Sequence, residues 1–232
     1  MVALPPLHPG RLVRRYKRFL ADVELDGGEV VTAHCANPGS MKSCAVAGGR
    51  VWLSHSDDPR RRLAYSWELA RVGGQMIVIN TARGNQVVAE ALERGAVAEL
   101  AGAGTVRREV RVGDKSRIDF LLEDGGARTY VEVKSVTLAA GPGIAAFPDS
   151  VTERGARHME ELIRLRRAGH RAVLLFCVAR TRVARVRPAD EIDPTYGRTL
   201  RRAARAGVDI LAYGCAVGPK RITLRHRLPI DL

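Results

Sequence analysis

Short runs of alternating apolar and polar residues, separated by turns rich in glycine, proline and aspartate, fill the first third of the chain. Such runs predict β-strands, because strand side chains point alternately to the two faces of a sheet. About five short strands suit a small closed barrel such as the oligonucleotide-binding (OB) fold, although sandwiches and other small barrels give the same pattern. The expected strands lie near Arg11–Leu25, Val30–Cys35, Arg50–Ser56, Leu63–Val72 and Gln75–Thr81.

After residue 82 the pattern mixes helical and strand periodicity. Apolar residues at helical spacing predict a first helix from Asn85, as its N-cap, through about Arg94. A second helix is expected after a cap at Ser150 or Thr152, and a third over about Pro194–Arg205. Strands are expected at Val106–Val112, Ser116–Leu122, Arg128–Val136, Arg171–Val178, Val208–Tyr213 and Ile222–Leu228.

The order of these later elements is helix, three strands, helix, strand, helix, strand. This is the core order of restriction-endonuclease-like folds, although fold order alone does not establish function. The turn between the first two strands is expected at Gly113–Asp114. We therefore predict an α/β protein of the two-domain α+β kind, with an OB-fold-like barrel in residues 1–82 and a restriction-endonuclease-like domain in residues 83–232.

A surplus of basic residues changes this picture, since 38 Lys and Arg against 25 Asp and Glu give a formal net charge of +13. Such a charge attracts polyanions, chiefly nucleic acid or an anionic membrane, with basicity that only aids solubility as the alternative. No apolar run approaches the length of a membrane span, which disfavours the membrane. Nucleic acid is therefore the expected partner.

The chain's beginning and its cysteines indicate a cytoplasmic protein. Residues 1–10 are rich in proline and lack the apolar segment of a secretory signal. The cysteines show neither a C-x-x-C pair nor zinc spacing, so we expect reduced, buried thiols. They are Cys35, Cys44, Cys177 and Cys215.

Two carboxylates interrupt apolar strands that are expected to be neighbours. Asp119 lies in R-I-D-F-L, and Glu132 and Lys134 lie in Y-V-E-V-K. Because strand side chains alternate, Glu132 and Lys134 share one face, while Val131 and Val133 share the other. An antiparallel pair joined by a short turn can place Asp119 beside Glu132.

Phosphodiester hydrolysis explains why these residue types belong together. A hard cation screens the anionic backbone, and Mg²⁺ (or Mn²⁺) held by Asp119 and Glu132 would suit oxygen ligands of this kind. Lys134 could orient the attacking water or stabilise charge on the phosphate. The alternative is a surface salt bridge, because an isolated E-x-K tripeptide is common.

Three further residues are candidates for supporting roles. Glu90, on the flank of the preceding helix, could supply a third carboxylate, or it could be a solvated helix glutamate. Arg154 and His158 stand four residues apart on the second helix and could bind a phosphate and position it or donate a proton. Their alternative is ordinary capping and helix-surface chemistry.

Basic residues interleaved with aromatics mark the first expected strand, in R-R-Y-K-R-F. Guanidinium groups on phosphates and rings stacked on bases would suit a single-strand platform, and a solvated strand face is the alternative. A second basic cluster occupies an expected loop tip, where it could contact phosphates without reading sequence. The candidate nucleic-acid-binding residues are Arg14, Arg15, Tyr16, Lys17, Arg18, Arg60, Arg61, Arg62 and Arg154.

Several sequence blocks resemble the bacterial and archaeal sugar fermentation stimulation protein A family along essentially the whole chain. They are R-Y-K-R-F-L-A-D-V, H-C-A-N-P-G-S-M, S-R-I-D-F-L-L, Y-V-E-V-K-S-V-T-L, F-P-D-S-V-T-E-R-G-A-R-H and E-I-D-P-T-Y. The turn H-C-A-N-P-G-S-M departs from the family's pattern, because Ala36 and Pro38 stand where proline and threonine are expected. We therefore assign that turn no role.

The resemblance implies an OB-type barrel followed by a PD-(D/E)XK nuclease-like domain. It also implies nonspecific DNA binding and a link to sugar (maltose) metabolism that no residue of this chain explains. The nuclease-like motif falls on Asp119, Glu132 and Lys134, and the block T-E-R-G-x-x-H falls on Thr152 through His158.

Three functional hypotheses follow. The first is a Mg²⁺-dependent deoxyribonuclease with little sequence preference, in which Asp119 and Glu132 hold metal, Lys134 assists the water, and Glu90 and His158 support them. The second is a nonspecific DNA-binding regulator of sugar (maltose) metabolism genes without catalytic activity. The third, weaker hypothesis is a role in processing RNA or single strands.

Overall fold

Alternating inward side chains build a barrel from the first third of the chain, as predicted. The computed structural model describes residues 1–102, 104–113 and 116–232. Leu12, Val23, Leu53 and Trp67 are among the buried residues that fill the barrel. Its strands are β2 (Leu7–Tyr16), β3 (Leu20–Leu25), β4 (Val30–His34), β5 (Arg50–His55), β6 (Tyr65–Val72) and β7 (Gln75–Val78).

Pairing between distant strands closes this barrel. The strand order is β4-β3-β2-β5-β6-β7, and β4 also pairs in parallel with β6 through Ala33 and Tyr65. Closure pairs the edges that an open sheet would expose.

A second, mixed sheet forms the centre of the rest of the molecule, in the order β1-β16-β15-β13-β10-β9-β8. Strands β10, β13 and β15 are parallel to one another. The strands are β1 (Val2–Ala3), β8 (Thr105–Val112), β9 (Ser116–Asp124), β10 (Ala127–Val136), β13 (Arg171–Val178), β15 (Asp209–Gly218) and β16 (Arg221–Arg227).

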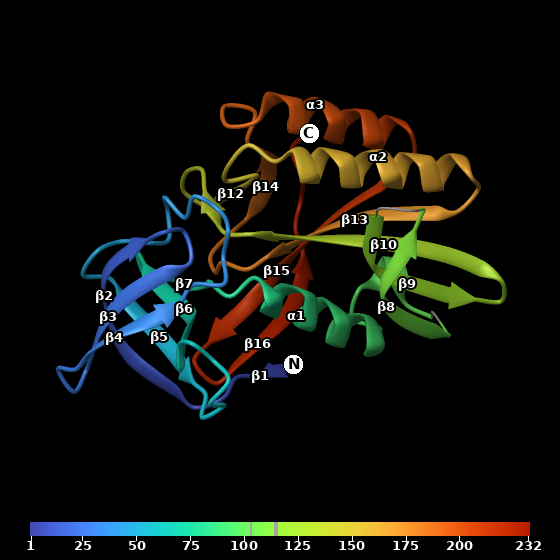
Figure 1. Ribbon diagram of the computed structural model, residues 1–232. Helices are drawn as coiled ribbons and strands as arrows, with labels where there is room; N and C mark the ends of the chain where they lie inside the picture. The colour runs from blue at the N-terminus through green and yellow to red at the C-terminus, as the bar shows by residue number, and fades with distance from the viewer. Residues whose placement is uncertain (103, 114–115) are drawn as a thin grey trace.

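Helices cover both faces of this sheet (Figure 1). Helix α1 (Ala82–Glu93) packs on one face, and α2 (Glu153–Arg167) and α3 (Pro194–Arg205) lie side by side on the other. Between them β13 is apolar and buried along nearly its whole length, as a strand covered on both faces must be. A short 3₁₀ turn, η1 (Ala98–Leu100), follows α1.

Of the two caps expected for α2, Ser150 and Thr152, the structure has Thr152, and α3 spans its expected residues. The Thr152 hydroxyl accepts a hydrogen bond from the Gly155 N–H (3.0 Å) and begins α2. Asp193 caps α3 in the same way, accepting from the Tyr196 N–H (2.9 Å), and Pro194 follows directly.

Three expectations about local structure are wrong. Arg11–Leu25 is a hairpin rather than one strand, because Lys17 and Arg18 adopt positive φ angles of 47° and 63° without a glycine to signal the turn. Asn85 does not cap the first helix, which begins at Ala82. The segment between β10 and α2, for which the sequence predicted no strand, contains strands β11 (Leu138–Ala139) and β12 (Ile144–Phe147), which pair with each other.

Two further features of the chain were not predicted. Strand β14 (Arg185–Pro188) pairs in parallel with β12. The first residues do not belong to the barrel, because Val2 and Ala3 pair with Ile222 and Arg221 of β16. Of the turn expected at Gly113–Asp114, Asp114 lies outside the described residues.

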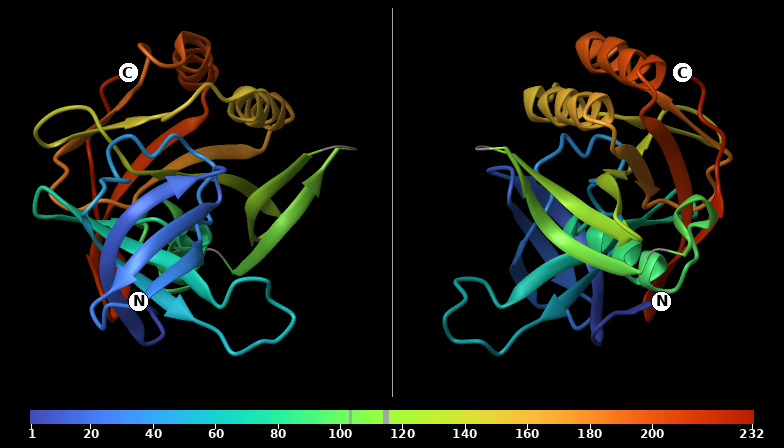
Figure 2. Two further views of the ribbon diagram at one scale, coloured as in Figure 1. Left: turned by 60° about the vertical axis from the view of Figure 1, so that its left-hand side comes forward. Right: turned by 90° about the vertical axis from the view of Figure 1, so that its right-hand side faces the viewer.

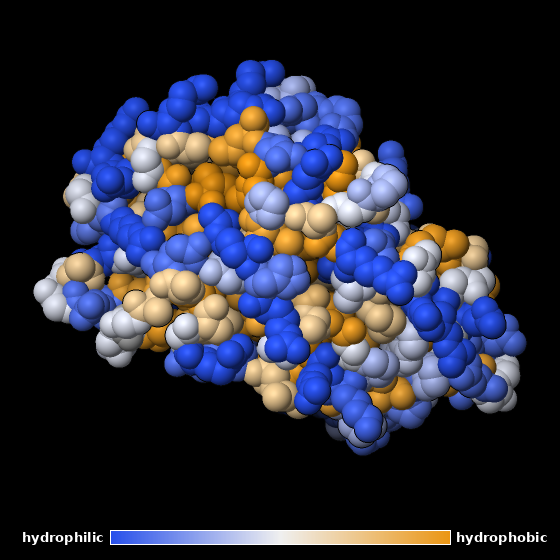
Figure 3. Space-filling view, turned by 180° about the vertical axis from the view of Figure 1, so that it is seen from behind, coloured by the Kyte–Doolittle hydropathy of each residue, from blue (hydrophilic) through white to orange (hydrophobic). Residues whose placement is uncertain are grey.

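The strands β8 and β9 form a long hairpin that projects from the body of the molecule beside α2 (Figure 2). Seen from behind, the surface carries hydrophilic residues over its whole extent, with apolar areas between them (Figure 3). Hydrophilic residues therefore do not gather on one part of that face. None of the helices in the described ranges is long and apolar enough to cross a membrane.

Candidate functional site

The carboxylate of Asp119 lies where strands β9 and β10 separate. Their paired register ends at Val131 and Phe120. Two residues beyond Val131, the Val133 N–H donates to Asp119 Oδ2 (2.7 Å). The Asn85 side chain on α1 donates to Asp119 Oδ1 (2.8 Å). Both oxygens are thus held in place by one backbone and one side-chain donor.

Glu132 lies beside Asp119 on β10 and is only 2% exposed. Its Oε1 accepts a hydrogen bond from Lys134 Nζ (2.7 Å) and another from His158 Nδ1. Its Oε2 is buried and has no hydrogen-bond partner among the described residues. A buried carboxylate oxygen without a partner is costly, and it points to a ligand, ion or water at that place.

The hydrogen bonds of His158 fix which ring nitrogen carries the proton. Arg154 Nε–H donates to His158 Nε2 (3.3 Å), so Nε2 is an acceptor. With Glu132 as the acceptor, Nδ1 carries the proton, and the 3.4 Å approach of Lys134 Nζ to the same nitrogen is then a close contact rather than a hydrogen bond. The predicted grouping of Asp119, Glu132, Lys134, Arg154 and His158 is present in the geometry.

The two carboxylates differ in electrostatic environment. Burial, and next the nearby Glu132 charge, raise the pKa of Asp119 from 3.8 to about 6, despite its hydrogen bonds from Val133 and Asn85. Burial acts to raise the pKa of Glu132 as well. The hydrogen bond from His158 and the charge of Lys134 outweigh this effect, so the pKa of Glu132 lies below its usual value. Two carboxylates that repel each other in this way gain from a cation placed between them.

The site opens into a cavity of about 560 Å³ between the β8–β9 hairpin and α2. Cationic side chains from both elements surround the two acids, and this arrangement suits an anionic ligand. Its lining residues are Glu109, Ser116, Arg117, Asp119, Glu132, Val133, Lys134, Arg154, Arg157 and His158.

The residues present fit a hard divalent cation. Within the described ranges there is no group of three or more His, Cys, Asp or Glu side chains arranged to hold a metal ion by themselves. Mg²⁺ does not need such a group, because it keeps several waters and binds through one or two carboxylates plus substrate phosphate. Asp119 and the unpartnered Oε2 of Glu132 would be those ligands.

Glu90 does not reach this site. Its carboxylate pairs with the amino group of Met1 and with Arg94 (2.9 Å). The residue of α1 that contacts Asp119 is Asn85, which the sequence suggested only as a cap. Glu90 therefore does not support the acids as expected, because its carboxylate is engaged by Met1 and Arg94. Arg117 and Arg157 also line the cavity and were missed.

The cations of the first hairpin are partly engaged within the barrel. Arg14 pairs with Asp22 (2.8 Å), and its guanidinium lies over the Tyr16 ring, 4.8 Å from the ring centroid. Arg15 donates to the carbonyls of Asn37 (2.9 Å) and Gly39 (3.0 Å). Arg15 therefore holds the neighbouring loop in place.

The remaining candidate cations are exposed. Lys17 and Arg18 form the tip of the first hairpin. Arg60, Arg61 and Arg62 lie in the loop between β5 and β6, where Arg60 pairs with Asp58 (2.9 Å) and Arg61 donates to Ser66 (2.7 Å). None of these residues lines the cavity of Asp119 and Glu132.

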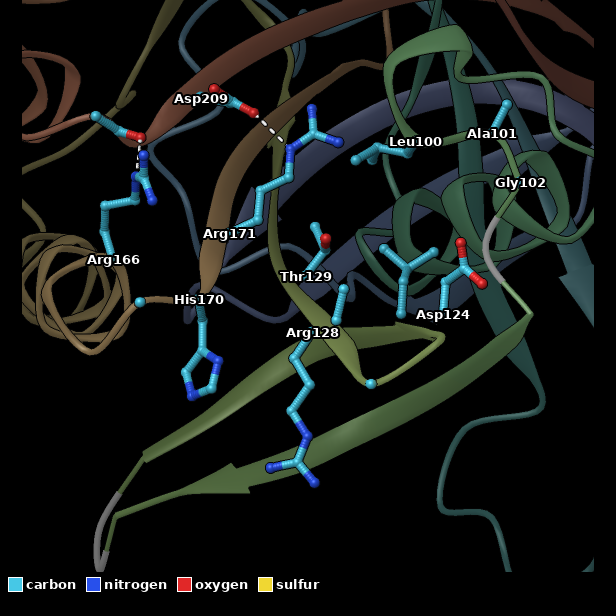
Figure 4. A pocket seen from close by; sticks show the side chains of 15 residues that line it. Leu100, Ala101, Gly102, Asp124, Arg128, Thr129, Arg166, His170, Arg171 and Asp209 are labelled. Atoms are coloured by element: carbon cyan, nitrogen blue, oxygen red, sulfur yellow. Dashed lines mark hydrogen bonds and ion pairs between the residues drawn. The ribbon is translucent and has the colours of Figure 1, made fainter.

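A different cavity, of about 620 Å³, lies at the opposite end of strands β10 and β13 (Figure 4). Its arginines are engaged within the protein. Arg171 pairs with Asp209 (2.8 Å), and Arg166 donates to the Gly207 carbonyl (3.0 Å). The carboxylate of Asp209 therefore has a cationic partner, and this cavity lacks the unpartnered carboxylate oxygen of the Glu132 site.

Comparisons with known proteins agree with this architecture. One family model, described as the SfsA N-terminal OB domain, matches residues 13–79. Another, described as the sugar fermentation stimulation protein RE domain, matches residues 82–221. Together they confirm the predicted barrel followed by an α/β domain.

Full-length relatives are also similar. A sugar fermentation stimulation protein homolog of Thioalkalivibrio sulfidiphilus is 54% identical over 229 residues, covering 98% of this chain and 97% of the relative. A homolog of Geobacter sulfurreducens is 54% identical over 230 residues, covering 99% and 98%. The solved structure of Pyrococcus furiosus SfsA in complex with Ca²⁺ has a TM-score of 0.91 and 29% identity, covering 100% of this chain and 98% of that one.

Proposed function

The chain belongs to the sugar fermentation stimulation protein family, and from this premise we propose that it is a cytoplasmic, divalent-cation-dependent nuclease that binds DNA with little regard to sequence. The observation that carries the proposal is the buried, unpartnered Oε2 of Glu132 beside the carboxylate of Asp119. Buried polar atoms that serve only structure are normally hydrogen-bonded. The Ca²⁺ complex of the Pyrococcus furiosus relative supports a cation-binding function.

The chain's own residues have separate tasks in this proposal. Asp119 and Glu132 would hold the cation, and Asn85 and His158 keep these carboxylates in their positions. Bound Mg²⁺ or Mn²⁺ would supply a water of lowered pKa and stabilise charge on the phosphate. Lys134, fixed by Glu132, would place its ammonium group beside the reacting phosphate.

Cations around the cavity would hold the DNA backbone on either side of that phosphate. Arg117 belongs to the projecting hairpin, while Arg154 and Arg157 belong to α2. These contacts are to phosphates, so they position the strand without selecting its sequence.

The test is nicking of supercoiled plasmid with Mg²⁺ or Mn²⁺. We expect cleavage by the unaltered protein and a loss of about a hundredfold or more in Glu132→Gln and Lys134→Met. Glu90→Gln, which changes a glutamate outside the site, is the matched control and should cleave normally. Cleavage that survives in both site variants, or that no divalent ion supports, would refute the proposal.

The second candidate is a DNA-binding regulator of sugar (maltose) metabolism genes without catalysis. One observation favours it: Lys134 and His158 already stabilise the ionised carboxylate of Glu132 without an added cation. Under this alternative, DNA binding would be insensitive to EDTA and to Glu132→Gln. Both candidates predict binding that weakens steeply as salt rises, because phosphate contacts release counterions.

A further inference from the structure

A third cavity, of about 630 Å³, lies between the barrel and the α/β domain. It shares Val133 and Lys134 with the cavity of the acidic site, so the two are neighbours. We propose that this interdomain cavity binds one unpaired nucleotide of the strand whose phosphate lies at Asp119 and Glu132. The proposal rests on the proposed nuclease function and specifies its substrate as a strand with an unpaired nucleotide beside the cleaved bond.

Cations from both domains face this interdomain cavity. Lys134 lies on the side of the acidic site, and Arg18 lies at the tip of the barrel's first hairpin. Arg18 forms no ion pair within the described part of the chain, and its φ of 63° is unusual for a residue other than glycine. An exposed, unpaired guanidinium held on a left-handed turn suits a phosphate that follows the nucleotide.

The remaining wall combines apolar surface with short polar groups. Phe147 packs on Tyr196 (5.1 Å between ring centroids) and on Phe176 (5.8 Å), and it also lines the cavity. Val151, at 73% exposure, is an uncovered apolar side chain of the same lining. A base could cover these apolar groups while hydroxyls bind its polar edge. The hydroxyls of Ser135 and Ser150 form no hydrogen bond within the described residues and are available for this. The other polar lining groups already have partners within the protein, namely Asn37, Thr81, Asn85 and Thr152.

One acidic residue of the lining, Asp149, is engaged elsewhere. Its Oδ2 accepts from the Met41 N–H (3.3 Å) in the barrel. A Cβ atom at Gly39 would collide with the same carboxylate, so the loop needs glycine there to approach so closely. Asp149 thus joins the two domains, and Arg18 and Lys134 are the lining groups that would meet a phosphate.

The size and position of the cavity favour an unpaired nucleotide over a duplex. A volume of this order holds a small ligand, and a base inside it cannot remain paired to a complementary strand. A nucleotide next to the cleaved phosphate must therefore leave its helix or come from a single strand. Single strands and frayed ends do this at the least cost.

The experiment measures binding of fluorescein-labelled oligonucleotides to the full chain in Ca²⁺. We expect a single strand to bind about tenfold more tightly than a blunt duplex of the same sequence. Ala82→Tyr adds a ring at an exposed lining position and should remove this preference. Ala101→Tyr makes the same change in the cavity of Figure 4 and should leave it intact. Val151→Glu, which adds a negative charge at an exposed position, should weaken single-strand binding without disturbing the fold.

Equal affinity of the unaltered protein for single strand and duplex would overturn the proposal. So would single-strand binding by Ala82→Tyr and Val151→Glu that matches the unaltered protein. The nuclease proposal fails separately: if no divalent ion supports cleavage but Ala82→Tyr still abolishes the single-strand preference, the pocket stands and the hydrolase does not. Cleavage without any single-strand preference would refute the nucleotide pocket and leave the nuclease proposal intact.

Discussion

Two buried glutamates, one in the barrel and one in the α/β domain, differ in how their oxygens are used. Glu68 is 1% exposed and Glu132 is 2% exposed, so burial does not separate them. Glu68, on β6, accepts both guanidinium contacts of Arg83 (2.9 and 3.0 Å) and a hydrogen bond from Ser54 (2.9 Å). Asn80 donates to it as well.

The glutamate of the α/β domain has all its partners on one oxygen. Lys134 and His158 both contact Oε1 of Glu132, and Oε2 has none within the described residues. Glu68 is thus a closed ion pair that joins the barrel to α1, whereas Glu132 is open on the side of a cavity. The difference shows that burial alone does not mark a candidate ligand. Oε2 of Glu90 is also unpartnered, so the open oxygen of Glu132 is informative because it comes together with a second carboxylate at a cavity.

The largest expected effect concerns the closed glutamate. Glu68→Ala should lower the free energy of unfolding by about 3–5 kcal/mol, because it leaves Arg83 partly buried without its partner. Urea denaturation followed by circular dichroism measures this. The double variant Glu68→Ala with Arg83→Ala should recover part of the loss. A loss below about 1 kcal/mol in the single variant would mean that the pair is not structural.

The next effect concerns the open glutamate. Ca²⁺ at a hundred times its dissociation constant should stabilise the folded protein by about 2.7 kcal/mol, since a ligand of the folded state adds its binding free energy. Glu132→Gln should abolish this gain, and Glu90→Gln should keep it. Thermal denaturation with and without Ca²⁺ provides the measurement. A gain that persists in Glu132→Gln would place the ion elsewhere.

A smaller effect follows from the pKa of Asp119, raised from 3.8 to about 6. A carboxyl group with a raised pKa binds its proton more tightly when folded, so it destabilises the metal-free protein as pH rises from about 4 to about 6. Relative to Asp119→Asn, the unaltered protein in EDTA should lose about 1 kcal/mol of stability between pH 5 and pH 7. Urea denaturation at both pH values tests this. A difference in unfolding free energy between the two proteins that is the same at both pH values would contradict the raised pKa of Asp119.

The smallest effect concerns two arginines, one without an ion pair and one with a partner. Arg157 is exposed beside the acidic cavity and forms no ion pair within the described residues, whereas Arg14 is paired with Asp22. Arg157→Ala should weaken DNA binding equally for all sequences and reduce the slope of log affinity against log salt by about one. Arg14→Ala should change the slope little. Equal changes of this slope in both variants would show that Arg157 contributes no more to DNA binding than the paired Arg14.

Strand alternation predicted the centre of the candidate site. The two-residue period placed Glu132 and Lys134 together, and the two are in contact in the structure. The helix cap at Thr152 is also a local signal, since Thr152 bonds the residue three positions ahead. Sequence reasoning succeeded where one residue's neighbours in the chain decide its position.

Sequence reasoning failed where contacts between distant segments of the chain decide the position of a residue. Asn85 carries an ordinary capping signal, and only the packing of α1 on β10 turns it toward Asp119. The turn at Lys17 and Arg18 uses positive φ angles without glycine, so no residue type announces it. The closure of Glu68 by Arg83 joins residues of the barrel and of α1, and neither residue reveals the other in the sequence.

The pairing of Val2 and Ala3 with β16 has a consequence for how this protein can be divided. The chain enters the α/β sheet, leaves it to build the whole barrel, and returns at α1, so the barrel is an insertion rather than a detachable module. A fragment that starts at residue 83 would lack β1 and expose the backbone of β16 as a sheet edge open to aggregation. We expect the barrel and the α/β domain to unfold together, and only the full-length chain to fold stably.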